Sequence, residues 1–151
     1  MRVVILWMLL AVAAGAATPR ASDPPTAAID AAERLQDTAR LYRNGLRTGA
    51  PPAALERLLG ELERGLQAVE QAHAVWAPSV PEESRQAVEV ERQAIRRGCN
   101  RMHEHLRQLS EVLCSNPDDH ARMASLAIDV GRQAGSCEKS LRTVRRLVPA
   151  V

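Results

Sequence analysis

The sequence has very few aromatic residues: no phenylalanine, one tyrosine and two tryptophans among 151 residues. It also has no segment in which apolar and polar residues alternate with period two over a useful length, which argues against a β-sheet. Alanine, leucine, arginine, glutamate and glutamine dominate instead, and these are strong helix formers. We therefore expect an all-α protein.

An excess of one charge is missing as well. The 20 basic and 18 acidic residues give a formal net charge of +2 at pH 7. Because the two signs alternate along the chain, we expect no basic face for nucleic acid and no polybasic patch for a membrane surface. Such a pattern is typical of the solvated side of helices.

The sequence lacks the common catalytic motifs. It contains no G-x-S-x-G, no H-E-x-x-H, no P-loop and no glycine-rich dinucleotide turn. The acidic pairs Glu82-Glu83 and Asp118-Asp119 lie at expected helix starts, where carboxylates favour the positive end of the helix dipole. We therefore expect no catalytic residue and no enzymatic activity.

The first 17 residues have the layout of a secretory signal peptide. Arg2 precedes an apolar run over residues 3–14, and an A-x-A-like cleavage site follows at residues 14–16. The apolar run is too short to span a bilayer, which takes about 20 residues. We expect residues 1–17 to be removed on export, leaving a periplasmic or secreted chain with no membrane anchor. Residues 18–25 are expected to be a flexible lead-in.

Four segments carry apolar residues at alternating steps of three and four, which places these residues on one face of a helix. The segments cover about residues 26–47, 52–76, 81–114 and 116–148, with proline or glycine between them. In the last segment, Asn116 is the expected N-cap and Pro117 the first helical residue. Short turns between such segments predict an antiparallel up-down-up-down four-helix bundle over residues 26–148.

The apolar face of each expected helix gives the candidate core. The core positions are Ala28, Ala32, Leu35, Ala39, Tyr42, Leu46, Leu55, Leu59, Leu62, Leu66, Val69, His73, Trp76, Ile95, Cys99, Met102, Leu106, Leu109, Leu113, Met123, Ala127, Val130, Ala134, Cys137, Leu141, Val144 and Val148. Apolar residues beside these faces are expected to form a docking surface for a protein partner: Leu58, Val75, Leu126 and Ile128.

The three cysteines predict one disulfide, because exported chains favour oxidation. Counted from the turn near Ser115, Cys99 lies about 24 Å along its helix and Cys137 about 32 Å along the next. A tilt that removes this mismatch of about one helical turn would allow the Cα separation of about 5.5 Å that a disulfide needs. Cys114 is too far from both. We predict a Cys99–Cys137 disulfide and a free thiol at Cys114, with a homodimer through Cys114 or through helix faces as an open alternative.

A metal site has weaker support. Cys99, Met102 and His103 cluster on the third helix, and Cys99 and His103 are four residues apart on one face, which suits a metal. Two ligands do not make a site, and the disulfide would consume the thiol. We therefore expect no metal and no cofactor, with Cys99, Met102 and His103 as the candidates if one binds. His73, on an apolar face, is expected to be a boundary histidine.

The stretch from Val130 to Arg142, VGRQAGSCEKSLR, resembles the fourth helix of cytochromes c′, which are exported four-helix-bundle haem proteins. In that family a C-x-x-C-H motif in the last helix holds the haem covalently. Here Cys137 matches the second cysteine, Ala134 stands in place of the first, and Glu138 stands in place of the axial histidine. The resemblance implies the bundle fold without covalently bound haem.

Together these features lead us to expect an exported, non-enzymatic helical bundle with a structural or protein-binding role and no haem. The alternative is a periplasmic haem- or metal-binding carrier related to the cytochrome c′ bundles. The sequence does not identify the protein partner.

Overall fold

The computed structural model of the protein describes residues 24–76 and 80–148. This part of the chain folds into four long α-helices and one short 3-10 turn, and no strand occurs within it. The elements are α1 (Pro24–Thr48), α2 (Pro52–Trp76), η2 (Glu82–Ser84), α3 (Arg85–Ser115) and α4 (His120–Leu147). The predicted all-α, four-helix fold is confirmed. The predicted signal peptide, residues 1–17, lies outside the described residues.

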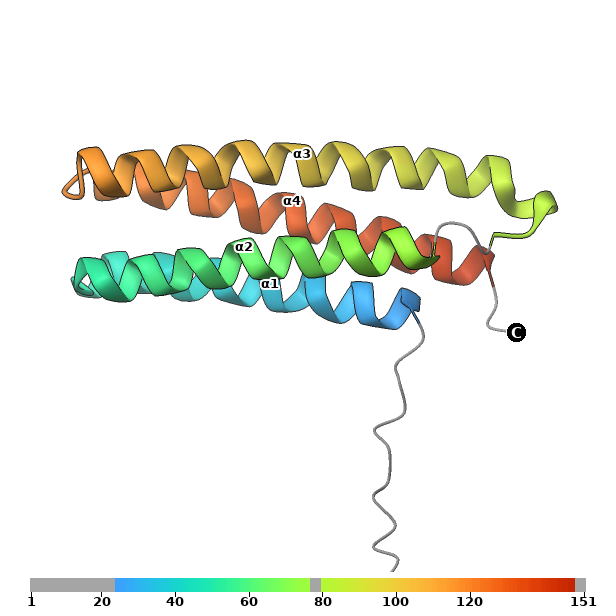
Figure 1. Ribbon diagram of the computed structural model, residues 1–151, viewed down its shortest axis with the longest axis horizontal. Helices are drawn as coiled ribbons and strands as arrows, with labels where there is room; N and C mark the ends of the chain where they lie inside the picture. Colours follow the sequence, from blue (N-terminus) through green and yellow to red (C-terminus); the bar gives the residue numbers. More distant parts are fainter. Residues whose placement is uncertain (1–23, 77–79, 149–151) are drawn as a thin grey trace, which may run out of the picture.

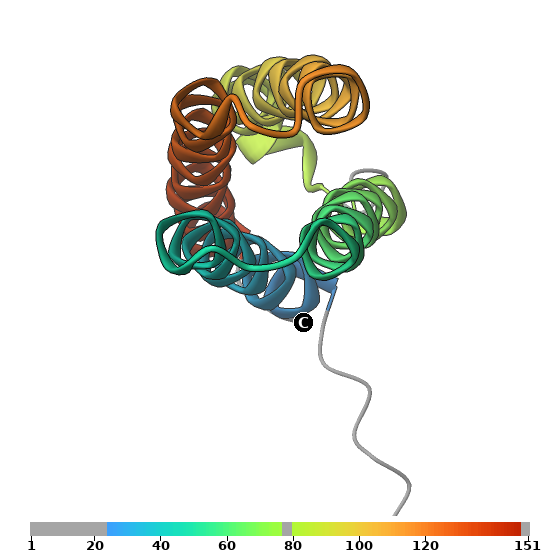
Figure 2. The same cartoon turned by 90° about the vertical axis from the view of Figure 1, so that its left-hand side faces the viewer.

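Successive helices run in opposite directions and surround a shared core (Figure 1). Three pairs of helices pack extensively against each other: α1 with α2, α1 with α4, and α3 with α4. The fourth pair, α2 and α3, makes much less contact, and the end view in Figure 2 shows α2 standing away from α3. The bundle is therefore a ring of four helices with one weak seam.

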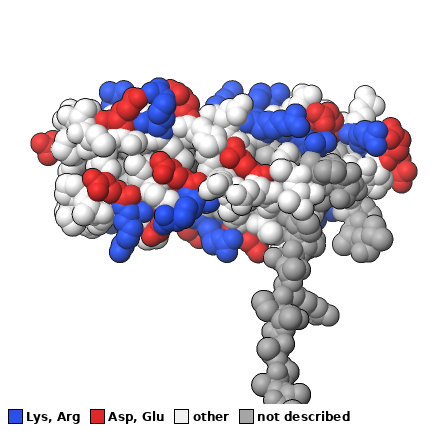
Figure 3. Space-filling view, viewed as in Figure 1, with Lys and Arg blue, Asp and Glu red and all other residues white. Residues whose placement is uncertain are grey.

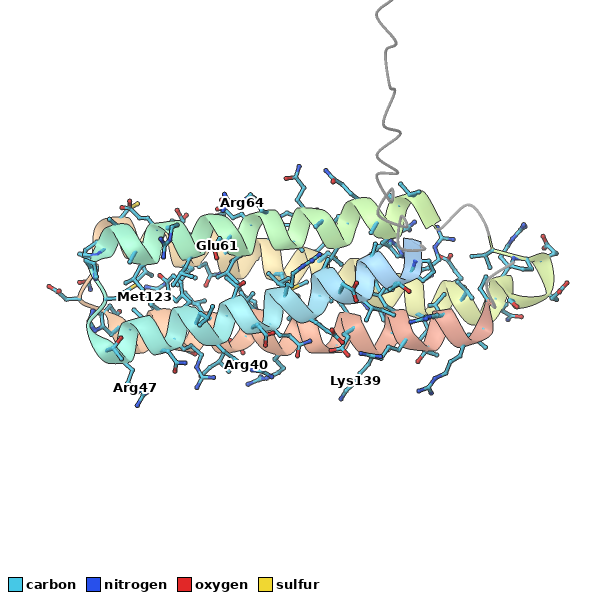
Figure 4. All side chains as sticks on the ribbon, turned by 90° about the horizontal axis from the view of Figure 1, so that it is seen from below. Arg40, Arg47, Glu61, Arg64, Met123 and Lys139 are labelled. Carbon is cyan, nitrogen blue, oxygen red and sulfur yellow. The ribbon has the colours of Figure 1, made fainter. Side chains whose placement is uncertain are left out.

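The predicted core positions lie in the core, which also includes Ile29, Ala31, Val80, Val88, Val112 and Leu126. Every predicted position whose side chain is described is buried, except Val148, which is half-buried against the cluster. Tyr42 is fully buried in α1, and its hydroxyl donates a hydrogen bond to Met123 Sδ at 3.6 Å. Burial raises the pKa of Tyr42 to about 12. Figure 4 shows Met123 among the helices, whereas Arg47 and Lys139 extend from the bundle.

The end of α1 depends on a glycine. Gly49 has a φ of 71°, a left-handed conformation that strains residues with a side chain. Ala50 N donates to Gly45 O at 2.8 Å and Gly49 N to Leu46 O at 3.3 Å, which is the Schellman arrangement. Together with the two prolines that follow, this glycine ends α1 where the sequence predicts.

The start of α1 differs from the prediction. The helix begins at Pro24, so the last two residues of the expected lead-in, 18–25, belong to α1. Proline fits the first turn of a helix because the amide hydrogen that it lacks would have no helical acceptor there. The rest of that lead-in lies outside the part of the chain that the structure describes.

The start of α4 also differs. Asp119, not Asn116, is the N-cap, and its Oδ1 accepts a hydrogen bond from Arg122 N at 3.1 Å. The preceding residues form a turn, in which Asp119 N donates to Asn116 O at 3.0 Å. The predicted cap at Asn116 is therefore wrong, because the turn needs residues 116–119 to reverse the chain.

Charged side chains of both signs intermix along the face seen in Figure 3. Most of the ion pairs join residues three or four apart on one helix, such as Arg107 with Glu104 and Arg40 with Asp37. Solvent screens these exposed pairs, so each adds little to helix stability. Of the helices in the described ranges, none combines the length and the apolar character that crossing a bilayer requires.

Candidate functional site

Helices α3 and α4 bring Cys99 and Cys137 together. A hydrogen bond joins their thiols, and Cys137 Sγ also lies 3.8 Å from the carbonyl oxygen of Ile95. Both side chains are buried, with 4% of Cys99 and 1% of Cys137 exposed. Cys114 is exposed at the end of α3, and all three cysteines carry free thiols in this structure.

The corrected start of α4 explains why the two thiols meet. Cys99 precedes the end of α3 at Ser115 by 16 residues, and Cys137 follows His120 by 17 residues. At 1.5 Å per residue, the two cysteines are about 24 and 26 Å from the turn. The expected mismatch of one turn is therefore absent, and no special tilt of the helices is needed.

The hydrogen bond between the thiols shifts their pKa values in opposite directions. Donating to Cys137, together with burial, raises the pKa of Cys99. Accepting from Cys99 lowers the pKa of Cys137.

A pocket of about 240 Å³ opens over Cys99 in the weak seam between α2 and α3. Glu70 and His73 of α2 line it together with Ile95, Arg96, Cys99 and Asn100 of α3. Cys99 is thus the member of the thiol pair that faces this opening.

His73 is 7% exposed in the wall of this pocket. Burial lowers the pKa of His73, and the positive charges of Arg92 and Arg96 lower it further, against a smaller opposite effect of Glu89. The imidazole is therefore neutral at pH 7. The expected boundary histidine forms part of the α2–α3 seam.

A larger groove of about 600 Å³ continues along the same seam. Its lining is mostly polar and comprises Glu63, Gln67, Glu70, His103, Leu106, Arg107, Ser110 and Glu111. His103 Nε2 lies 2.9 Å from Glu70 Oε1 across the groove, and Arg107 is held by Glu104 and Glu111 on its own helix. We call this feature the acidic groove, because its three carboxylates outnumber its one arginine.

The three metal candidates do not share one environment. Cys99 contacts Cys137 on α4, Met102 is fully buried in the core, and His103 pairs with Glu70 at the surface of the seam. Across residues 24–76 and 80–148, no group of three or more histidine, cysteine, aspartate and glutamate side chains is arranged to hold a metal.

The positions that correspond to the cytochrome c′ haem motif lie in α4. Ala134 is fully buried. Glu138 accepts hydrogen bonds from Arg142 Nε at 2.6 Å and from Gln36 Nε2 of α1 at 2.7 Å. The bond from Arg142, and then that from Gln36, lowers the pKa of Glu138. Glu138 is therefore an ionised contact between α4 and α1, and Arg142 extends this contact to Glu33.

The predicted docking surface is only partly exposed. Val75 is 69% exposed and Ile128 is 38% exposed, but Leu126 is buried and Leu58 is half-buried. The prediction is wrong for Leu126. Helix α4 packs against both α1 and α3, so the buried part of its surface is wider than the single row of apolar residues that the spacing defines. Val90 of α3, 63% exposed, is an apolar surface residue that the stripe pattern missed.

Comparison of the chain with protein-family models, with curated proteins and with solved structures finds no match.

Proposed function

We propose that this protein is an exported four-helix bundle that binds a basic helical segment of a partner protein and catalyses no reaction. The acidic groove between α2 and α3 is the observation that carries the proposal. The signal-peptide layout of residues 1–17 and the lack of catalytic motifs support export and a non-enzymatic role.

The groove has the shape and chemistry for one more helix. Its walls are two antiparallel helices that contact each other weakly, which leaves room for a further helix along the seam. The carboxylates of Glu63, Glu70 and Glu111 line it, and Glu63 forms no ion pair within the described residues. A partner helix with arginine or lysine toward Glu63 is the complementary occupant.

Binding of two synthetic peptides tests this proposal. One is an amphipathic helix of leucine and arginine, the other the same sequence with glutamate in place of arginine, and each is titrated calorimetrically into the processed chain. We expect the basic peptide to bind and the acidic peptide not to bind, with weaker binding at high salt because salt screens exposed charges.

Two charge-reversal variants locate the binding. Glu63→Lys changes the groove, and Asp30→Lys makes the same change at an exposed carboxylate of α1. We expect Glu63→Lys to weaken binding of the basic peptide about tenfold, equivalent to about 1.4 kcal/mol, and Asp30→Lys to leave it unchanged. Equal effects of the two variants, or equal binding of both peptides, would contradict a groove-specific partner.

Export is tested separately. The full chain is produced in a bacterium with a periplasm, and the intact mass of the protein is measured in each cell fraction. We expect the periplasmic protein to begin after residue 16 or 17, where the small-residue site lies. Full-length protein confined to the cytoplasm would contradict export.

A disulfide between Cys99 and Cys137 completes the proposal, with Cys114 as the free thiol. The contact between the two buried thiols, each on one of two packed helices, supports it. The bond would close a loop of about 38 residues and add about 3–4 kcal/mol to stability.

The proposed protein carries no haem. Cys137 is committed to Cys99, Ala134 offers no thiol, and Glu138 is held by Gln36 and Arg142. The visible spectrum of protein from haem-supplied cells tests this statement. We expect no Soret band, and a Soret band would favour the haem-carrier alternative.

A further inference from the structure

Cys99 belongs both to the thiol pair and to the lining of the pocket in the α2–α3 seam. Its thiol is hydrogen-bonded to Cys137, and it lines the pocket formed with Glu70, His73 and Arg96. Cys137, 1% exposed, lies behind it against Ile95 and is not part of the pocket lining. A molecule that enters the pocket therefore meets the sulfur of Cys99 and not that of Cys137.

We propose that the Cys99–Cys137 pair is a thiol–disulfide exchange site, entered through this pocket by small organic disulfides and thiols that react at Cys99. The inference rests on the proposed disulfide between the two cysteines. It adds that the bond is made and broken in the folded protein, through a defined opening and in a defined order.

The exchange has two balanced steps. Cys99 sulfur attacks one sulfur of the small disulfide, whose S–S bond breaks, and the first small thiol leaves with the proton of Cys99. Cys137 sulfur then attacks the mixed disulfide at Cys99, and the second small thiol leaves with the proton of Cys137. The protein dithiol is oxidised by two electrons, and the small disulfide is reduced to two thiols.

The size of the pocket restricts the substrate class. A volume of about 240 Å³ admits the reacting sulfurs and the adjoining atoms of a small flexible molecule. Close contact with Cys137 also ensures that a mixed disulfide at Cys99 is attacked at once.

Arg96 at the opening favours a substrate with an anionic group. Glu70 is paired with His103 at 2.9 Å, whereas Arg96 forms no ion pair within the described part of the chain. Burial and the two nearby arginines also lower the pKa of His73, so that this residue adds no charge. The guanidinium of Arg96 is therefore the charge at the opening that a carboxylate of the substrate can pair with.

The order of attack is tested on the reduced, folded protein carrying Cys114→Ser, with oxidised glutathione as the anionic small disulfide. We expect this protein to form the internal disulfide with no lasting adduct. With Cys137→Ser added, we expect a stable glutathione adduct on Cys99. With Cys99→Ser added instead, we expect no adduct on Cys137. Intact mass gives the products, and far-ultraviolet circular dichroism confirms that each variant is folded.

The charge preference is tested with Arg96→Glu and with cystamine as a cationic disulfide. We expect the variant to react about tenfold more slowly with oxidised glutathione and faster with cystamine, because the sign of the local field is reversed. Arg101→Glu, an exposed arginine of α3 outside the pocket lining, is the matched control and should change neither rate.

Two results would overturn the inference: an adduct on Cys137 in the folded Cys99→Ser protein, or no reaction of folded Cys137→Ser protein with either disulfide. A second experiment distinguishes failure of the exchange proposal from failure of the disulfide proposal. In it, the Cys114→Ser chain is refolded from denaturant in the presence of an oxidant. If the disulfide forms on refolding but not in the folded protein, the proposed structural disulfide is supported and the proposed exchange site is contradicted. If no disulfide forms on refolding, both the proposed disulfide and the proposed exchange site are contradicted.

Discussion

Cys137 packs against Gly98 so closely that a side chain at position 98 has no room. A Cβ atom on Gly98 would lie 2.5 Å from Cys137 Sγ, a distance that requires one of the two to move. Gly98 is buried in the middle of α3, where glycine is a poor helix former. Close packing of α4 on α3 is the physical reason for a glycine at this position.

The first prediction concerns this contact. Gly98→Ala should destabilise the reduced protein by about 1–3 kcal/mol, because overpacking outweighs the gain in helix propensity. Gly60→Ala in α2 is the control, since the nearest atom is the flexible end of Arg64 at 3.5 Å. It should stabilise by about 0.5–1 kcal/mol. Urea unfolding measures both values, and a neutral Gly98→Ala would show that α4 can move away.

The second prediction concerns the disulfide. A reductant should lower the melting temperature of the exported protein by several degrees, since a bond worth about 3–4 kcal/mol is lost. Cys114→Ser protein should behave in the same way, because Cys114 is exposed and remote from the pair. The double variant Cys99→Ser and Cys137→Ser should show no response. If the reductant leaves the wild-type melting temperature unchanged, the exported protein carries no such bond.

The third prediction concerns pH. Burial, Arg92 and Arg96 hold the pKa of His73 below its usual value. The unfolded chain therefore binds a proton more readily than the folded chain, and stability decreases as the pH falls below the unfolded pKa of about 6.5.

Urea unfolding at about pH 7.5 and about pH 5.5, on either side of the unfolded pKa of histidine, measures this loss. His73→Gln should lose less stability on acidification than the wild type. His120→Gln, at an exposed position at the start of α4, should lose as much as the wild type. The same loss in both variants would assign the pH effect to other groups.

The fourth prediction concerns the start of α4. Asp119→Ala should destabilise the protein by about 1 kcal/mol, because the amide of Arg122 loses its side-chain acceptor. Asn116→Ala should cost less than about half of that, since the N-cap is elsewhere. Thermal unfolding ranks the two variants. A larger loss of stability for Asn116→Ala would indicate that Asn116 is the N-cap of α4, as the sequence predicted.

The sequence predicts the helices and their inward faces because both depend on local order. The spacing from Leu55 to Val69 and from Ile95 to Leu113 defines one side of each helix whatever packs against it, and these residues are buried. Gly49 similarly ends α1 through its own backbone conformation.

Features that depend on the separation between helices are less predictable. Glu63, Gln67 and Glu70 recur at helical spacing, as do His103, Arg107 and Ser110, but the same polar stripes occur on any solvated helix. Only the weak contact between α2 and α3 turns them into a groove. Leu126 is buried for a similar reason, because the width of the buried arc of α4 depends on two neighbouring helices.

The thiol pair shows most directly what the sequence can and cannot predict. Sequence spacing identified Cys99 and Cys137 as the pair able to meet, but it placed them one turn out of register because it started α4 at Asn116. The hydrogen bonds of the turn that ends at Asp119 correct that register. The pocket that makes Cys99 the reachable sulfur depends on α2, which the spacing of the cysteines does not describe.

The arrangement of the seams also has a consequence for the order of folding. Two of the three extensive seams, α1–α2 and α3–α4, join helices that are neighbours in the chain, so each hairpin gains its contacts after closing a short loop. The third joins α1 to α4, where Gln36 and Glu138 are 102 residues apart. A distant contact is stabilising only after a long loop has been closed, at a cost in entropy. We therefore expect docking of the two hairpins through α1 and α4 to be the slow step of folding. Changes in the α1–α4 seam should therefore slow folding, whereas changes in α2 should mainly speed unfolding.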